Sequence, residues 1–98
     1  MNEAYEVRVD AKAGSSLHAL DPLRRQRLGT LIVRLGRDLG DVLASDHVVR
    51  IPDRRIIDRD DPMLAFFQWR DRDLEVGFYV DRLKKRIAIT SINPNPRW

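Results

Sequence analysis

Arginine supplies most of the side chains in this sequence that could bind a charged ligand. Of the 18 basic residues, only Lys12, Lys84 and Lys85 are lysines. Arginine forms paired hydrogen bonds to phosphate and carboxylate groups and stacks on nucleic-acid bases. The composition therefore suits a surface for RNA, DNA or an acidic peptide. A GC-rich genome would raise the arginine content in the same way without any functional cause, and composition alone leaves both explanations open.

Three of these arginines recur at helical spacing. Arg27, Arg34 and Arg37, together with Thr30, fall on one stripe of a predicted helix, and none of the three arginines has a glutamate four residues away. Stripes of this kind are most often solvated helix faces. A stripe of arginine without such partners is less usual. We therefore predict that Arg27, Arg34 and Arg37 contact a nucleic acid or a partner protein.

Other groupings of reactive side chains are sparse. The sequence has no cysteine, no glycine-rich phosphate loop and no HExxH motif. His18 and His47 fall on different predicted elements, and each is interpreted as an ordinary surface or half-buried histidine. The acidic residues within 58–61 and 71–73 could recruit a divalent ion, but they lack the glycine and terminal glutamate of a calcium loop. We predict that they solvate turns, and we expect neither a metal nor a cofactor.

The elements that must position these side chains are organised around three strands near the C-terminus. Met63–Arg70, Leu74–Asp81 and Arg86–Ile92 have strand composition and are separated by short charged turns. Leu74–Asp81 alternates apolar and other residues, so one face should be buried. Connections this short force antiparallel neighbours, because a parallel crossover needs a dozen or more residues. The pattern predicts an antiparallel meander as the core.

The first half of the chain predicts a strand followed by two helices. Ala4–Asp10 alternates as an amphipathic strand. Lys12–Leu20 is either a short helix or a loop that ends in one helical turn. The second helix, Asp21–Leu39, has an aspartate N-cap, a proline at the first helical position and leucines at helical spacing. Gly40 is the expected stop signal.

The remaining segments are a strand, an ambiguous stretch and an irregular tail. His47–Ile51 predicts a strand closed by a Pro-Asp turn. Arg54–Pro62 either extends a hairpin or forms a charged loop, and Asn93–Trp98 cannot be regular because of its two prolines. With 98 residues, we expect one α+β domain spanning residues 1–98. No apolar run approaches membrane-spanning length and no signal-peptide core is present, so we expect a cytoplasmic protein.

The order of these elements, with three short motifs, resembles the RelE/ParE toxin superfamily. The motifs are a YEVxV-type first strand at Tyr5–Val9, a proline-initiated helix rich in Arg and Leu at Asp21–Leu39, and a closing hairpin at Val76–Ile92. The resemblance implies an N-terminal strand and a helical pair, followed by an antiparallel meander sheet packed against the helices. Ser45–Pro62 is longer than the resemblance leads us to expect.

The resemblance also implies a function, in one of two forms. RelE-like members are ribosome-dependent messenger-RNA endonucleases, whereas ParE-like members inhibit DNA gyrase. Either kind is the toxin of a type II toxin–antitoxin system, and a cognate antitoxin wraps around it. The expected partners are thus an antitoxin and either the ribosome with its messenger RNA or DNA gyrase. The alternative is a non-enzymatic, arginine-rich interaction module that binds an acidic protein or nucleic acid.

RelE-like endonucleases use basic residues on the central strands and an aromatic or basic residue near the C-terminus. Carried over to this sequence, the pattern assigns catalytic roles to Arg70, Arg97 and Trp98, and Arg72 could add charge for nucleic-acid or partner binding. A second use of Trp98 is open, in which the indole folds back as a hydrophobic cap and Arg97 is solvated.

Two positions depart from the RelE pattern. Gln68 stands where a basic residue is expected on the first central strand, and Glu75 stands where the next strand should carry an arginine. Metal-free RNA cleavage needs a group that takes the proton of the 2′-hydroxyl and cations that stabilise the phosphorane. The sequence alone identifies cations for this task and no base.

Overall fold

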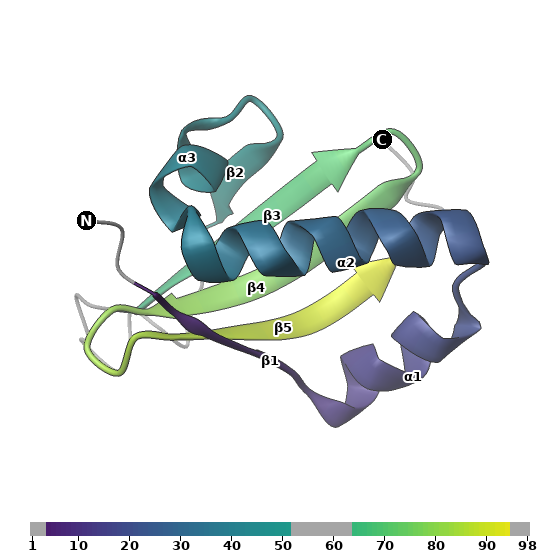
Figure 1. Ribbon diagram of the computed structural model, residues 1–98, viewed down its shortest axis with the longest axis horizontal. Coiled ribbons are helices and arrows are strands. Elements are labelled where there is room, and N and C mark those ends of the chain that lie inside the picture. Colours follow the sequence, from purple (N-terminus) through teal and green to yellow (C-terminus); the bar gives the residue numbers. More distant parts are fainter. Residues whose placement is uncertain (1–3, 52–63, 95–98) are drawn as a thin grey trace.

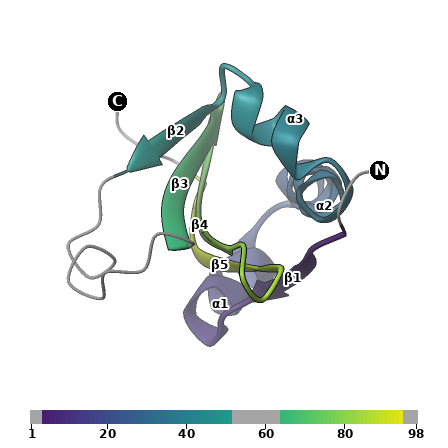
Figure 2. The same cartoon turned by 90° about the vertical axis from the view of Figure 1, so that its left-hand side faces the viewer.

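A computed structural model describes residues 4–51 and 64–94 of the chain. These residues form one five-stranded sheet with the strand order β1-β5-β4-β3-β2. Helices α2 and α3 lie over one face of the sheet, and α1 packs against the β5 side (Figure 1). Seen from the side, the opposite face carries none of the described helices (Figure 2). This two-layer α+β arrangement confirms the predicted fold class.

The predicted meander is confirmed, since β3, β4 and β5 are consecutive antiparallel neighbours. Strand β2 adds to β3, also antiparallel. The first strand, β1, pairs with β5 in parallel, so the sheet is mixed. Three helices separate β1 from β2, and the chain reaches the far edge of the sheet before the meander begins. The strands are β1 (Glu6–Val9), β2 (Val48–Ile51), β3 (Leu64–Asp71), β4 (Leu74–Asp81) and β5 (Arg86–Asn93).

The first two helices begin at aspartate caps. The Asp10 carboxylate accepts from the Ala13 backbone N–H at 2.8 Å, and Asp21 accepts from the Arg24 backbone N–H at 3.4 Å. The resulting helices are α1 (Ala11–Ala19) and α2 (Pro22–Arg37). The helical interpretation of residues 12–20 is therefore confirmed, and the loop alternative is wrong.

The predicted stop at Gly40 is wrong. Helix α2 ends at Arg37, and a third helix, α3 (Leu39–Ala44), contains Gly40 in its first turn. Asp38 connects the two helices with a non-helical backbone (φ −130°, ψ 45°). Its N–H still donates to the Arg34 carbonyl at 2.7 Å, while its own carbonyl accepts from Val42 at 3.1 Å. Helix α3 therefore leaves the direction of α2, and both Leu39 and Val42 are buried in the core.

The hydrophobic core lies between α2 and the inner face of the sheet. Phe78 is fully buried, and its neighbours on the same face of β4 are buried as well, which confirms the predicted alternation of Leu74–Asp81. Helix α2 contributes Leu28, Leu31 and Leu35 to this core. Ile32 packs against it while partly buried. The predicted packing of Phe78 and Val80 under this helix is thus confirmed.

A β-bulge explains the unusual spacing of isoleucines in β5. Ile87 and Ile89 are two residues apart, but the next buried isoleucine, Ile92, is three residues further on. The pairing shifts between Gly77 and Phe78, so that Thr90 is the extra residue on β5. An extra residue returns the following side chain to the inner face. All three isoleucines therefore reach the core.

The start of the chain is held against the end of α2. The Tyr5 N–H donates to the Gly36 carbonyl at 2.9 Å. A side chain at position 36 would place its Cβ 3.2 Å from the Tyr5 carbonyl oxygen, so glycine permits this close approach. No helix among the described residues is long and apolar enough to cross a membrane.

Candidate functional site

The face of the sheet opposite the described helices carries a group of polar side chains at the end of β3 and the start of β4. Arg70 lies directly across from Glu75 in the register of these strands. The Gln68 amide donates to Glu75 Oε1 at 2.7 Å, and Arg70 Nε lies 3.4 Å from Glu75 Oε2. Arg70 also donates from Nη2 to the Gln68 side-chain oxygen at 3.0 Å. We call Gln68, Arg70 and Glu75 the outer-face triad.

The outer-face triad combines a held carboxylate with a solvent-facing cation. The Glu75 side chain is 17% exposed, whereas that of Arg70 is 44% exposed. Gln68 and Arg70 fix the carboxylate from two sides. Such a pair can accept a proton at the carboxylate and bind a phosphate oxygen at the guanidinium.

Sequence reasoning treated the two non-basic members of this triad as departures from the RelE pattern. The signal that could have grouped them is the register of the hairpin. A two-residue turn at Arg72 and Asp73 places position 70 opposite position 75. Side chains directly opposite or diagonal on one face of an antiparallel pair are within reach of each other.

His47 supports the backbone beneath the triad. The Arg70 N–H donates to the His47 carbonyl at 2.8 Å, and His47 Nδ1 lies 3.0 Å from the Arg70 carbonyl. Because a carbonyl only accepts, Nδ1 carries the hydrogen in this contact. The imidazole also lies 6.4 Å from the Trp69 indole, between ring centroids. We expected His47 to be an ordinary surface or half-buried histidine, and it is exposed. Its two contacts with the Arg70 backbone also hold the end of β3.

An aromatic pair continues the same face along the strands. The rings of Phe66 and Tyr79 lie 4.8 Å apart at a tilt of 43°. Phe66 also lies over Gly77, where an added Cβ would sit 3.0 Å from the ring and would clash with the Ser91 hydroxyl. Glycine at position 77 therefore leaves room for the Phe66 ring and for the Ser91 side chain on β5.

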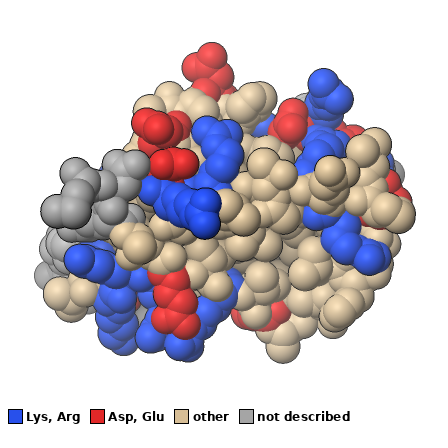
Figure 3. Space-filling model, in the orientation of Figure 1, with Lys and Arg blue, Asp and Glu red and all other residues tan. Residues whose placement is uncertain are grey.

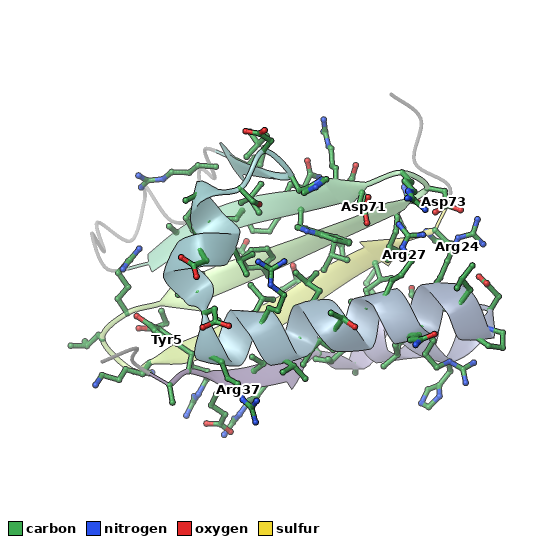
Figure 4. All side chains as sticks on the ribbon, turned by 45° about the horizontal axis from the view of Figure 1, so that its top comes forward. Tyr5, Arg24, Arg27, Arg37, Asp71 and Asp73 are labelled. Atoms are coloured by element: carbon green, nitrogen blue, oxygen red, sulfur yellow. The ribbon has the colours of Figure 1, made fainter. Side chains whose placement is uncertain are left out.

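The arginines of the α2 stripe lie in two different environments. Arg27 Nη1 lies 2.8 Å from Asp73 Oδ1, and Arg27 Nη2 donates to the Asp71 carbonyl at 2.7 Å. Arg24 approaches the other Asp73 oxygen at 2.6 Å and Asp21 at 2.9 Å. These contacts join the N-terminal half of α2 to the β3–β4 turn (Figure 4). The acidic residues at 71–73 therefore bind arginines, whereas we predicted that they only solvate the turn.

These guanidinium groups change the ionisation of the turn. Hydrogen bonds from Arg27, and then from Arg24, lower the pKa of Asp73 from 3.8 to about 2. The lowered pKa keeps Asp73 ionised at acidic pH values at which an ordinary aspartate is largely protonated. The Arg27 guanidinium is therefore engaged by Asp71 and Asp73 within the chain.

The other candidate residues lie in different places. Arg34 and Arg37 are exposed in the last turn of α2. Arg37 lies at the opposite end of the helix from Arg27 (Figure 4). Arg72 is exposed at the β3–β4 turn with a left-handed backbone (φ 55°), close in sequence to the triad. Arg97 and Trp98 lie outside the described residues, as does Arg54–Pro62. Among the described residues, no group of three potential metal ligands gathers.

Comparison with solved structures identifies the fold. A chain of the archaeal RelE–RelB complex from Pyrococcus horikoshii OT3 superposes with a TM-score of 0.78, covering 97% of this chain and 99% of that chain at 18% identity. This chain has the RelE fold. The resemblance to the RelE/ParE superfamily is thereby confirmed at the level of the fold.

Two further solved structures share the RelE fold. The isolated E. coli RelE toxin has a TM-score of 0.64 at 15% identity, covering 97% of this chain and 88% of that chain. A chain of the RelBE2 toxin–antitoxin complex from Mycobacterium tuberculosis has a TM-score of 0.58 at 18% identity, covering 94% and 99%. No family model and no curated protein matches the sequence. At these identities the similarity concerns the fold alone.

Proposed function

We propose that this chain is the toxin of a toxin–antitoxin pair. The observation that carries the proposal is the RelE fold along nearly the whole chain, with a TM-score of 0.78 to a chain of a RelE–RelB complex. Other solved structures with this fold are the isolated E. coli RelE toxin and toxin–antitoxin complexes. A cognate antitoxin is the partner that this proposal requires.

The antitoxin has two kinds of surface to bind on this chain. Arg34 and Arg37 are exposed on α2 and would attract an acidic segment. Strands β1 and β2 are the two edges of the described sheet, and an extended segment could add to either one. The two modes differ in their dependence on salt, because exposed ion pairs are screened and backbone hydrogen bonds are much less so.

We propose that the toxin cleaves cytoplasmic messenger RNA at the outer-face triad, as a RelE-like interferase. Arg70 binds a non-bridging oxygen of the scissile phosphate, and Glu75 takes the proton of the adjacent 2′-hydroxyl. The 2′-oxygen then forms a bond to phosphorus as the bond to the 5′-oxygen breaks, and water returns a proton to the departing oxygen. Gln68, 2.7 Å from Glu75, orients the carboxylate. No metal takes part in these steps.

One observation favours a second candidate. The Arg70 guanidinium already faces a carboxylate 3.4 Å away, so part of its charge is neutralised before any phosphate arrives. A ParE-like gyrase inhibitor, or an interaction module without enzymatic activity, needs no cleavage site and would use the exposed arginines for binding alone. The two candidates make different predictions for the first process that stops in a cell.

Pulse labelling after induced expression tests the proposal. If the chain cleaves messenger RNA, incorporation of labelled methionine should fall before that of labelled thymidine, and Glu75→Gln should restore methionine incorporation. Thymidine incorporation that falls first, and falls equally in the Glu75→Gln variant, would instead favour gyrase inhibition. Lys12→Gln, an exposed change on α1, serves as the matched control.

A further inference from the structure

The turn between β4 and β5 is an ordered protrusion at one end of the sheet. It extends beyond β1 and lies at the opposite end of β4 from the outer-face triad (Figure 1). The Lys84 N–H donates to the Asp81 carboxylate at 3.0 Å, and the Lys85 carbonyl accepts from Glu6 at 3.0 Å. The backbone of the turn is therefore fixed, while its side chains reach into solvent. At its tip, Leu83 is 74% exposed.

Positive charge is concentrated on this protrusion. We use the name basic hairpin for the turn residues 82–85, Arg86 at the start of β5, and Arg8 on β1. Glu6 lies opposite Arg86 and forms ion pairs with both Arg8 and Arg86, at 2.8 and 3.7 Å. The basic hairpin carries five cationic side chains, and the two adjacent acidic residues are Glu6 and Asp81. The formal charge of these seven residues, +3, equals the net charge of the whole chain, so the charges of the remaining residues sum to zero. Lys and Arg side chains gather in this region, at the lower left of the space-filling view (Figure 3).

The shape of the basic hairpin suits a phosphate backbone better than a protein surface. A standard protein interface buries about 800 Å² on each partner, which a short convex turn cannot supply. The wide, shallow minor groove of an RNA duplex is bordered by phosphates and accepts blunt protrusions by shape and charge. In the turn, Arg82 and Lys84 flank Leu83, and all three side chains are exposed.

We propose that the basic hairpin binds the phosphate backbone of duplex RNA. The choice of RNA rests on the proposed function. The contact lies far from the outer-face triad, because Glu75 and Asp81 are six residues apart on one strand, which is about 20 Å. The basic hairpin thus holds a folded part of the RNA and takes no part in the chemistry. Its loss should raise the KM for a structured RNA and leave kcat unchanged.

Fluorescence anisotropy with a labelled RNA duplex, measured over a range of salt concentrations, tests this proposal without needing cleavage or toxicity. The Arg82→Gln/Lys84→Gln double variant should bind more weakly and should reduce the slope of log K against log salt by about 1 for each cation removed. Lys12→Gln/Arg50→Gln removes the same charge at two exposed positions outside the basic hairpin and should leave the slope unchanged. Unchanged thermal unfolding of both variants verifies that they fold.

Several outcomes would overturn the assignment. An unaltered slope in the hairpin variant, or an equal reduction in the control variant, would mean that RNA does not dock on the basic hairpin. Absence of duplex binding by the wild-type protein would have the same meaning. Tighter binding to a DNA duplex than to an RNA duplex would reject RNA as the ligand. If the hairpin variant loses antitoxin affinity and keeps RNA affinity, the surface binds protein.

Discussion

Arg27 on α2 and Asp73 in the β3–β4 turn form an ion pair of 2.8 Å between positions 46 residues apart in the sequence. Arg24 contacts the second oxygen of the same carboxylate. The turn that leads from Arg70 to Glu75 is therefore anchored to the helix layer, although the triad itself lies on the opposite face of the sheet. Arg24 and Arg27 in the first half of α2 hold the turn in position, whereas Arg34 and Arg37 in its second half are exposed.

This anchor should make stability depend on pH in the acid range. The pKa of Asp73 is lowered from 3.8 to about 2 in the folded chain. A lowered pKa means that the contribution is fully present above about pH 4 and is lost as the pH falls toward 2. Asp73→Asn should lower the thermal midpoint at neutral pH and flatten its decline between pH 4 and 2. A decline identical to that of the wild type would show that another group is responsible.

The core makes a second prediction. Phe78 is fully buried, so Phe78→Ala should lower the free energy of unfolding by roughly 3–5 kcal/mol, measured by denaturant titration. This is a large share of the stability of a small domain. Leu83→Ala, at an exposed position, is the matched control and should change stability by less than about 0.5 kcal/mol. Equal effects at the two positions would contradict the burial of Phe78 in the core.

The strands of the meander were predictable because their signals are local. The alternation in Leu74–Asp81 and the short turns around it determine both the buried face and the antiparallel order. The parallel pairing of β1 with β5 depends on residues about eighty positions apart, and no local pattern encodes it. The break at Asp38 was missed because helical spacing continues through Leu39, whose burial is decided by the sheet beneath it.

The candidate site was predictable only in part, for a similar reason. Arg70 was assigned from its type and its strand, whereas Glu75 was set aside because its charge differs from that of the RelE pattern. The register of the hairpin brings the two residues together and supplies a carboxylate that the sequence analysis lacked. The partners of Arg27 could not be inferred from α2 alone, because they come from a distant turn.

The triad makes a third prediction, on RNA cleavage in vitro. Glu75→Gln keeps the shape of the side chain and removes the proton acceptor, so cleavage should fall by about 10²–10⁴-fold, the range for loss of a general base. Cleavage of a labelled RNA by ribosome-bound protein is the measurement, and unaltered circular dichroism is the control for folding. Full activity in Glu75→Gln would assign the base elsewhere.

The exposed arginines of α2 make a fourth prediction. Arg34→Glu/Arg37→Glu should weaken binding of the antitoxin, and the wild-type affinity should fall with added salt. Isothermal titration calorimetry at two salt concentrations measures both effects. Wild-type affinity in the double variant would rule out this part of α2 as the docking surface and favour addition of a strand at a sheet edge.

The tail makes a fifth prediction, with two distinguishable outcomes. If Trp98 caps the protein, deletion of Arg97 and Trp98 should lower the thermal midpoint, and toxicity should fall only in proportion. If the pair stacks on RNA beside Arg70, the midpoint should be unchanged while RNA binding and growth arrest are lost, since stacking contributes roughly 1–3 kcal/mol per base. A deletion that alters none of these properties would exclude both roles.

Growth after induced expression tests the central proposal most directly. Cells that express this chain alone should stop growing. We expect a small acidic protein to be encoded next to it, and co-expression of that protein should restore growth. Arrest that this neighbour relieves is the result expected for a toxin with a cognate antitoxin. Normal growth at an expression level verified by immunoblot, with the folded protein recovered from the cells, would contradict the assignment of this RelE-fold chain as a toxin.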